Sequence, residues 1–361
     1  MTVYANKPAF NVREKLKELE KPSGIAGRAM LAADTPQEQF NLIGAGRRNL
    51  LRNALFEISQ RGNFQVDASG SAHVATSASY NVDGWYAYAN GGTVNTKTQM
   101  VTLPTGEKVR SMKTTSQSAV GSSFLHPAQN FENQTWMENQ DFTISVWVRT
   151  NRPGQKLRLC DTLSCFTPGN VVPNDEQWHF MVATQRVGTG LGYGGGGFQM
   201  QPAFGGGALA VGDYVEFALP QIELGTVATP FDYRPYADEL ALCHRYFERI
   251  SKSGSTDQSG SAATETLISN GFAYTGTRSL NFVHFTVVKR VAPTVTINDY
   301  TKIEVLDSNA GWVTTSGFGS RANERGTRLD LTHPGNVLTP GRALELRMLD
   351  GGLIDIDAEL T

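Results

Sequence analysis

Residues 209–249 read LAVGDYVEFALPQIELGTVATPFDYRPYADELALCHRYFER and contain the signals of a strand, a break and a helix in one run. Polar and apolar residues alternate over 214–219, which is typical of a strand with two different faces. Pro220 weakens the pairing because proline has no backbone N–H. Beyond it, three apolar residues recur at helical spacing: Leu240, Cys243 and Phe247. The stretch therefore predicts a strand that closes a sandwich and then a helix that leads into a second unit.

Short predicted strands, separated by turn signals, continue on both sides of this stretch. Such a density of strands without intervening helices indicates a β-sandwich or barrel. A polar Ser- and Gly-rich segment at 251–263 reads as a flexible linker between two β-rich units. The predicted strands are 64–66, 72–75, 84–88, 100–103, 118–124, 142–149, 156–160, 178–187 and 213–223, followed by 266–268, 280–288, 294–297, 303–306, 329–331, 343–349 and 354–358.

The first residues of the chain predict a helical arm. Three apolar residues form a stripe at i, i+4 and i+7: Val12, Leu16 and Leu19. A helix of about ten residues is marginal by itself in water. We therefore expect the stripe to dock on other copies of the chain or on a partner protein, and the alternative is a frayed terminal helix.

Four parts of the chain, in this order, resemble bacteriophage tail-fibre and virion-associated proteins. AGRAMLAADTPQEQFNLIGAG (26–46) resembles a connector upstream of a jelly-roll module. NLLRNALFEISQRG (49–62), followed by YNVDGWY (80–86), resembles the start of that module. The run from QIELG through ATPF and RPY to ELALC and RYF, within 221–247, resembles its end. RVAPTVT (290–296) and the final DAEL resemble a fibre-tip domain.

The resemblance implies an all-β protein with an arm and two β units. Residues 1–47 would be an N-terminal helical arm for anchoring and trimerisation, and 48–236 a jelly-roll β-sandwich similar to carbohydrate-binding modules. Residues 237–263 would be a linker helix with a flexible linker, and 264–361 a small β-sandwich-like tip domain. The implied homotrimer would attach to other virion tail or collar proteins by its arm and adhere to host surface polysaccharide. The alternatives are a structural collar, neck or tail appendage and a glycan-degrading enzyme.

Composition and charge narrow the function further. Charged residues make up 18% of the chain and the net charge is −2, so electrostatic binding of nucleic acid has little support. No apolar run is long enough to span a bilayer, and Met1 to Leu19 lacks the apolar core of a signal peptide. We therefore expect no membrane insertion, synthesis in a host cytoplasm and a place in the virion.

Motifs for catalysis, metals and cofactors are weak. A GxGxxG pattern at 190–195 continues into more glycines, which favours a Gly-rich loop over a dinucleotide site. The six histidines lack metal spacing, no DxDxD loop marks calcium, and no GxSxG motif occurs. Three acidic residues cluster near Trp136 and favour a solvated loop over a glycosidase pair: Glu132, Glu138 and Asp141. We predict no cofactor, no metal and no catalytic residue.

The cysteines and the aromatic residues are the remaining candidate functional groups. An odd number of cysteines argues against a disulfide framework; Cys160 and Cys165 are either bridged across a short turn or free, and Cys243 is expected inside the helix face. Sugars stack their apolar faces on exposed aromatic rings, so aromatics near amide-rich or Gly-rich loops are candidates. The candidates are Trp136, Trp312, Trp85, Tyr86 and Tyr88.

Two of the tryptophans have a competing interpretation. Trp85 and Trp147 both fit the core of a sandwich. Trp147, however, alternates with the apolar residues of 142–149 and so falls on the nominally polar face of that strand. It is therefore either covered by a second layer or exposed at a groove.

Overall fold

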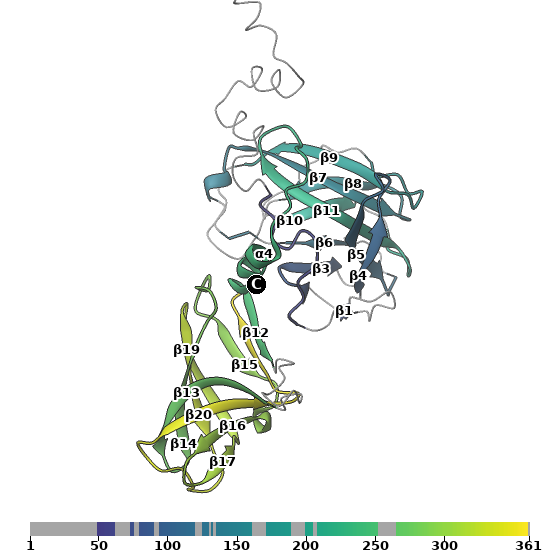
Figure 1. The fold of residues 1–361 in the computed structure, drawn as a ribbon. Helices are drawn as coiled ribbons and strands as arrows, with labels where there is room; N and C mark the ends of the chain where they lie inside the picture. Colours follow the sequence, from purple (N-terminus) through teal and green to yellow (C-terminus); the bar gives the residue numbers. More distant parts are fainter. Residues whose placement is uncertain are drawn as a thin grey trace, which may run out of the picture.

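The computed structural model describes residues 49–61, 73–75, 79–89, 94–119, 125–129, 131–132, 135–160, 171–188, 199–204, 208–251 and 265–359. Within these ranges the chain forms five β-sheets and a single α-helix (Figure 1). The predicted all-β fold class is therefore confirmed. The predicted arm, with Val12, Leu16 and Leu19, lies outside the described residues. No helix in the described part of the chain is long and apolar enough to span a membrane.

The first unit is a sandwich around a six-stranded antiparallel sheet. In spatial order its strands are β1 (His73–Ala75), β4 (Val94–Thr102), β5 (Lys108–Ser116), β11 (Tyr214–Leu224), β7 (Asp141–Thr150) and β9 (His179–Arg186). A three-stranded sheet lies opposite and consists of β2 (Ser79–Val82), β3 (Trp85–Ala89) and β6 (Leu125–Ala128). A further pair is formed by β10 (Gln199–Phe204) and β8 (Gln155–Cys160).

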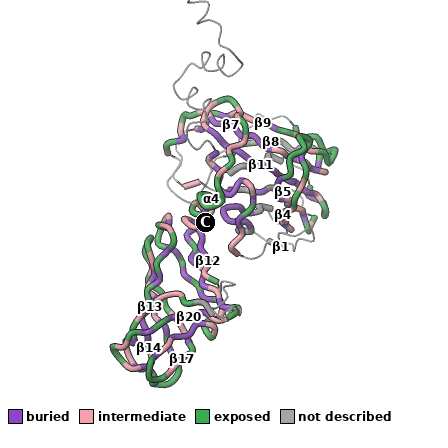
Figure 2. The backbone as a smooth tube through the Cα atoms, viewed as in Figure 1, coloured by how far each residue is buried: buried purple, intermediate pink, exposed green. Residues whose placement is uncertain are grey.

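The core of this unit follows from the alternation of residues along β7 and β11. Four alternate residues of β7 lie in one apolar cluster, together with Phe217 of β11 and Trp85 of the opposite sheet. Buried stretches run along the strands of both units in Figure 2. Burying one such side chain contributes about 1.5–3 kcal/mol, so the shared core stabilises both layers. The β7 residues in the cluster are Phe142, Ile144, Val146 and Val148.

A β-bulge in β11 places two consecutive side chains, those of Ala218 and Leu219, on the same face of the sheet. The pairing with β7 shifts register between Ala218 and Gln221, and Leu219 has φ of 49°. The extra residue bends the strand locally, as bulges do. Leu219 consequently packs on the face of the sheet opposite the core, beside Ala218.

The second unit is also a sandwich. Its seven-stranded sheet runs in the order β17 (Gly311–Thr314), β16 (Ile303–Asp307), β20 (Ala343–Leu349), β13 (Glu265–Thr275), β14 (Arg278–His284), β19 (Gly326–Thr332) and β18 (Gly317–Asn323). A three-stranded sheet of β12 (Phe247–Ser251), β21 (Leu353–Asp357) and β15 (Thr294–Ile297) supplies the other layer. Residues of both sheets, such as Ile356 and Leu329, share one apolar core.

The two units join at α4 (Tyr236–His244) and β12 (Figure 1). Pro235 precedes the helix, as the sequence indicates. The helical pattern predicted through Phe247 is wrong at its end: the helix stops at His244, and Phe247 begins β12. The reason is tertiary, because Phe247 pairs with Asp357 of β21 and extends the three-stranded sheet. The first and last strands of the second unit, β12 and β21, are therefore neighbours in one sheet.

Other differences from the predicted strands are local. The sequence does not predict β2, β5, β6, β12, β17 or β18, or the strand β10 within the Gly-rich segment 191–210. Trp312, expected in a loop, lies in β17 opposite Leu306 of β16. Ser118 and Ala119 are described but belong to no strand, and residues 120–124 of that predicted strand lie outside the described residues.

The buried carboxylate of Asp307 holds two loops of the second unit together by hydrogen bonds. Asp307 Oδ1 accepts hydrogen bonds from the backbone N–H of Asn309 (2.8 Å) and Ala310 (3.4 Å), and Oδ2 accepts one from Thr339 (2.9 Å). Burial by itself raises the pKa of this carboxyl, but the three N–H groups outweigh it and lower the pKa of Asp307 below 3.8. The charged form therefore stabilises the β16–β17 turn.

We expect Asp307→Asn to lower the free energy of unfolding by about 2 kcal/mol at neutral pH, because hydrogen bonds to a charged acceptor are lost. The contribution of the carboxylate is present above the unfolded-state pKa of 3.8 and is lost as the pH falls through the lower folded-state pKa. The gap between the two proteins in thermal unfolding should therefore narrow below pH 3.8. Glu324→Gln, at an exposed carboxylate of the same unit, is the control, and a gap that does not change with pH would contradict this account.

Candidate functional site

The six-stranded sheet carries an ordered array of side chains on the face opposite its core. Trp147 of β7 lies directly across from Phe180 of β9 and Ala218 of β11. We call each set of residues that lie directly opposite one another on adjacent strands a rung. The next rung on this face places Arg149 across from Glu216. Side chains directly opposite each other on one face of a sheet interact, so each rung forms a continuous strip. One rung is therefore aromatic and its neighbour is charged.

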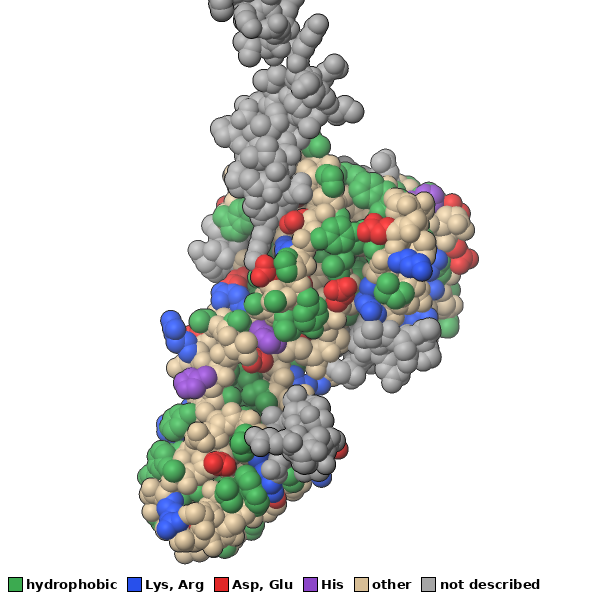
Figure 3. Space-filling model, in the orientation of Figure 1, with side chains coloured by type: hydrophobic (Ala, Val, Ile, Leu, Met, Phe, Trp, Pro, Cys, Tyr) green, Lys and Arg blue, Asp and Glu red, His purple; other side chains and the backbone are tan. Residues whose placement is uncertain are grey.

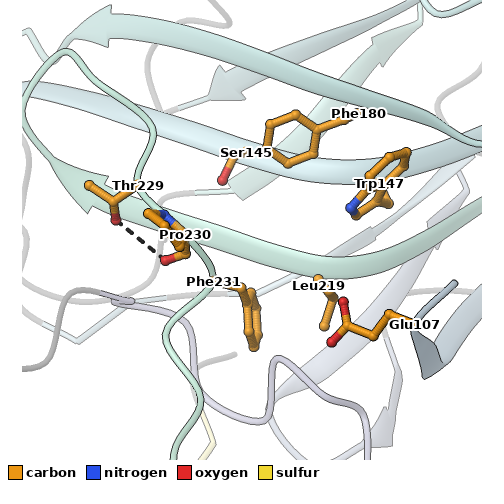
Figure 4. Close-up of a pocket in the computed structure, with 8 residues that line it drawn as sticks. All are labelled: Glu107, Ser145, Trp147, Phe180, Leu219, Thr229, Pro230 and Phe231. Atoms are coloured by element: carbon orange, nitrogen blue, oxygen red, sulfur yellow. Dashed lines mark hydrogen bonds between the residues drawn. The ribbon is translucent and has the colours of Figure 1, made fainter. Parts of the chain in front are cut away.

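A groove of about 250 Å³ opens over the aromatic rung (Figure 4). Trp147 and Phe180 lie side by side with ring centroids 5.4 Å apart and an angle of 51° between their planes. Phe180 is 50% exposed, and Trp147 is partly buried. The remaining lining residues, contributed by several segments, are Glu107, Ser145, Leu219, Thr229, Pro230 and Phe231.

The opposite wall of the groove comes from the segment that connects β11 to α4, residues 225–235, which we call the crossing segment. The Glu223 carboxylate accepts hydrogen bonds from the backbone N–H of Thr229 (2.8 Å) and from its hydroxyl (2.6 Å). Gln221 Oε1 accepts one from the backbone N–H of Asp232 (2.8 Å). These contacts fix the turn that presents Thr229, Pro230 and Phe231 to the groove. The sequence pattern of this segment indicates a junction only, whereas in the structure it is also a wall of the groove.

The charged rung beside the groove is centred on a buried carboxylate. Glu216 accepts hydrogen bonds from Gln99 Nε2 (2.6 Å), Ser111 Oγ (2.5 Å) and Arg149 Nε (2.8 Å). The Arg149 guanidinium in turn lies 4.8 Å from the ring centre of Trp178. Because the carboxylate is satisfied on several sides, this network supports the sheet face rather than offering Glu216 to a ligand.

A second cation–ring contact fixes the far end of the charged rung. Lys113 Nζ lies 3.6 Å from the ring centre of Tyr214, whose hydroxyl donates to Glu176 Oε2 (3.1 Å). Burial, helped by this hydrogen bond to Glu176, raises the pKa of Tyr214 to about 12. Burial also lowers the pKa of the Lys113 ammonium from 10.5. Tyr214 therefore stays neutral at physiological pH and acts as a hydrogen-bond donor.

The groove has the composition of a site for a small amphipathic ligand. Two adjacent aromatic rings offer an apolar surface, while Glu107, Ser145 and Thr229 supply acceptors and donors at the edge. Small-molecule sites commonly combine apolar walls with a few polar groups, although many are larger, at about 300–1,000 Å³. Sugar rings have C–H faces and hydroxyl edges that match such a surface.

The sequence-predicted residues of β3 do not belong to this groove. Trp85 is 0% exposed, packs edge-on against Phe56 at 5.1 Å, and donates from Nε1 to the carbonyl oxygens of Arg52 and Asn53. Tyr86 is also buried. Trp85 is therefore a core residue, as its competing interpretation holds, and neither ring is exposed at the surface where a sugar would stack. Tyr88 lies in β3, opposite His126 of β6, and its side chain lies outside what the structure describes.

Trp136 and Trp312 lie in different units, and neither lines the groove. Trp136 lies in a short 3-10 helix (Thr135–Met137), is 50% exposed and packs edge-on against the core residue Phe142 at 5.8 Å. Trp312 is partly buried on the seven-stranded sheet, with the Arg347 guanidinium 3.5 Å from its ring centre. The predicted aromatic residues thus do not form one site.

Features suited to other chemistry are few in the described residues. The groove is lined by one carboxylate, Glu107, which accepts a hydrogen bond from the Tyr233 hydroxyl; glycoside hydrolysis commonly uses two carboxyls about 5–9.5 Å apart. Within the described ranges, no group of three or more His, Cys, Asp or Glu side chains is arranged to hold a metal ion. Cys243 is buried and free, whereas Cys165 and the side chain of Cys160 lie outside these ranges.

Trp147 is the one lining residue of the groove that the sequence singles out, and the residues missed include Glu107, Phe180 and Phe231. The alternation within the predicted strand 178–187 could have indicated Phe180, because it puts Phe180 on the opposite face from its neighbour Met181, which is buried. Glu107 and Phe231 come from a turn and a crossing segment, where no periodic pattern exists. On the face seen in Figure 3, basic and acidic side chains are interspersed among apolar ones.

Comparison with known proteins gives weak structural likenesses. No family model matches the chain, and no curated protein matches it by sequence. The CBM22-1 xylan-binding domain of Paenibacillus barcinonensis Xyn10C is 14% identical over 43% of this chain and 95% of its own, with a TM-score of 0.27. The tripod (BppUct-A-L) from the baseplate of bacteriophage Tuc2009 is 14% identical over 66% of this chain and 84% of its own, with a TM-score of 0.27. The CBM22-1–CBM22-2 tandem of the same Xyn10C is 10% identical over 80% and 96%, with a TM-score of 0.26.

Proposed function

We propose that this protein is a bacteriophage virion appendage that adheres to saccharides of the host surface. The observation that carries the proposal is the groove in which Trp147 and Phe180 lie 5.4 Å apart and face the wall containing Phe231. A sugar ring would stack its C–H face on these aromatic side chains. Its hydroxyls would exchange hydrogen bonds with Glu107, Ser145 and Thr229. Binding of this kind is noncovalent and needs no catalytic step.

The virion assignment is supported by the sequence. Four segments that resemble phage fibre proteins occur in the order expected of a fibre, and the all-β fold agrees with them. In the proposed assembly, three copies associate through the arm at 1–47, which also attaches them to the tail or collar. Three grooves acting together would raise avidity beyond the affinity of one site. Light scattering on the purified protein, which gives its molar mass, tests the homotrimer.

Binding of the purified protein to host cells tests the adhesion proposal. We expect saturable binding that is lost when the surface glycans are stripped. If a phage lacking this protein adsorbs normally but loses particle integrity, the protein is a structural appendage instead. Release of reducing ends from host polysaccharide by the purified protein would make it a glycan-degrading enzyme and would overturn the proposal.

We expect Phe180→Ala to weaken saccharide binding roughly fivefold, since one of the two stacking rings is removed and about 1 kcal/mol of contact is lost. Because Phe180 is 50% exposed, the melting temperature should change little. Calorimetric titration with fragments of the host polysaccharide measures the affinity. Phe272→Ala, at an exposed phenylalanine of the second unit, is the matched control. Equal effects of the two substitutions would count against the groove.

A further inference from the structure

The seven-stranded sheet of the second unit has a row of basic and aromatic residues near one edge. Phe282 of β14 lies directly opposite Arg328 of β19, and Arg328 lies directly opposite Arg321 of the edge strand β18. Alternate residues of these strands form the apolar core, so the row occupies the outer face of the sheet. Phe282 is 47% exposed. An aromatic ring and two guanidinium groups are thus presented side by side.

The neighbouring rung of the same three strands leaves a hollow. It consists of His284, Gly326 and Asn323, and its middle position has no side chain. A Cβ atom on Gly326 would lie 2.8 Å from the carbonyl oxygen of Val283, so the close approach of these strands requires glycine. The resulting pocket has a volume of about 270 Å³. Arg325, in the turn between β18 and β19, also lines it.

The charges around this pocket are not balanced. Arg328 makes a bidentate ion pair with Asp330, at 2.7 and 2.9 Å. Among the residues that the structure describes, no carboxylate lies within ion-pair distance of Arg321 or Arg325. Placing Arg321 opposite Arg328 sets like charges against each other, which is unfavourable in a sheet. A bound anion would remove this repulsion.

We propose that the pocket lined by Arg321, Arg325, Arg328 and Phe282 binds an oxyanion substituent, phosphate or carboxylate, carried on a sugar. The planar guanidinium groups match the geometry of carboxylate and phosphate oxygens, and arginine binds both in a bidentate manner. The exposed ring of Phe282 gives the sugar a surface on which to stack. This second site deepens the proposed adhesion, because it selects charged surface polysaccharide, and it rests on that proposed function for its biological role.

Titration of the full-length protein with four probes tests the site: glucose 6-phosphate, glucuronate, glucose and inorganic phosphate. We expect one or both of the anionic sugars to bind at least tenfold more tightly than glucose, and this preference to weaken as the ionic strength rises. The two anionic sugars distinguish a phosphate from a carboxylate substituent. Inorganic phosphate that binds as tightly as glucose 6-phosphate would overturn the assignment to a saccharide, and equal binding of all three sugars would overturn the anion site.

Substitutions separate this site from the groove of the first unit. Arg321→Gln and Arg325→Gln should each weaken binding of the anionic sugar roughly tenfold, because each removes charged hydrogen bonds. Lys302→Gln, which removes one positive charge near the opposite edge of the sheet, should leave it unchanged. If neither arginine substitution reduces binding of the anionic sugar, the proposed pocket is wrong. Neutral saccharide bound at the Trp147 groove should be retained in all three variants, so that failure here remains distinguishable from failure of the adhesion proposal.

Discussion

Trp147→Ala is expected to weaken binding of the host saccharide roughly thirtyfold, equivalent to about 2 kcal/mol. Trp147 is the largest side chain that lines the groove, and it lies between Phe180 on one neighbouring strand and Ala218 on the other. Removing the indole deletes the main stacking surface and also releases Phe180 from its ring contact. The loss should therefore exceed that of Phe180→Ala, which leaves the indole in place.

Trp136→Ala is the matched control, because it removes a half-exposed tryptophan of the same unit that lies outside the groove. Circular dichroism and thermal melting must show that Trp147→Ala remains folded, since Trp147 also contacts the small apolar cluster around Leu219. The critical comparison is between the two variants in calorimetric titration and in cell binding. If Trp136→Ala abolishes binding while Trp147→Ala does not, the saccharide site lies at the 3-10 helix that carries Trp136, one of the candidates predicted from the sequence.

The central strands of both units could be predicted from the sequence because their residues alternate. Residues 142–149 and 213–223 match β7 and β11 closely, since each strand has one face in an apolar core. The strand β12 was not predictable in the same way. Its residues continue a helical spacing from α4, and only the pairing of Phe247 with Asp357, 110 positions away in the chain, makes it extended.

The candidate groove could be predicted only in part. The position of Trp147 on the nominally polar face was a usable signal, and the structure places it at a groove. Nothing in the local pattern links it to Glu107 or Phe231. These two residues reach the groove through the order β5-β11-β7 and through the bulge at Leu219, which are properties of the assembled sheet. The adjacent Trp85 and Tyr86 suggested an exposed aromatic cluster, but burial on the inner face decides their role.

The two units are held together by a buried cluster of charges at their junction. Glu359, near the end of the chain, lies 3.4 Å from both Arg52 and Arg61 of the first unit, and its side chain is almost fully buried. The Arg52 guanidinium also lies 3.7 Å from the ring centre of Tyr246, just beyond α4. Burial raises the pKa of Glu359, although the two arginines oppose that effect. Arg52, in the first unit, therefore contacts both Tyr246, just before the first strand of the second unit, and Glu359, just after its last strand.

We expect Arg52→Met to lower the melting temperature by roughly 6–12 °C, equivalent to a loss of about 3 kcal/mol. Methionine keeps most of the aliphatic stem, so the loss reports the reduced charge compensation at Glu359, which keeps its ion pair with Arg61, rather than a cavity. Scanning calorimetry at neutral pH measures it. Arg186→Met is the control, because Arg186 and its partner Asp141 are exposed at the surface, where an ion pair contributes about 0–1 kcal/mol.

The pH dependence and a second substitution identify the cause of that loss. Without Arg52, the pKa of Glu359 in the folded protein should rise further above the unfolded value of 4.5, so the folded state gains a proton as the pH falls. The stability of Arg52→Met relative to the native protein should therefore recover as the pH approaches 4.5. Arg52→Met combined with Glu359→Gln should be more stable than Arg52→Met alone at neutral pH, because no buried carboxylate is left with reduced compensation. A double variant no more stable than the single one, with no recovery at low pH, would mean that Arg52 acts through its packing on Tyr246 instead.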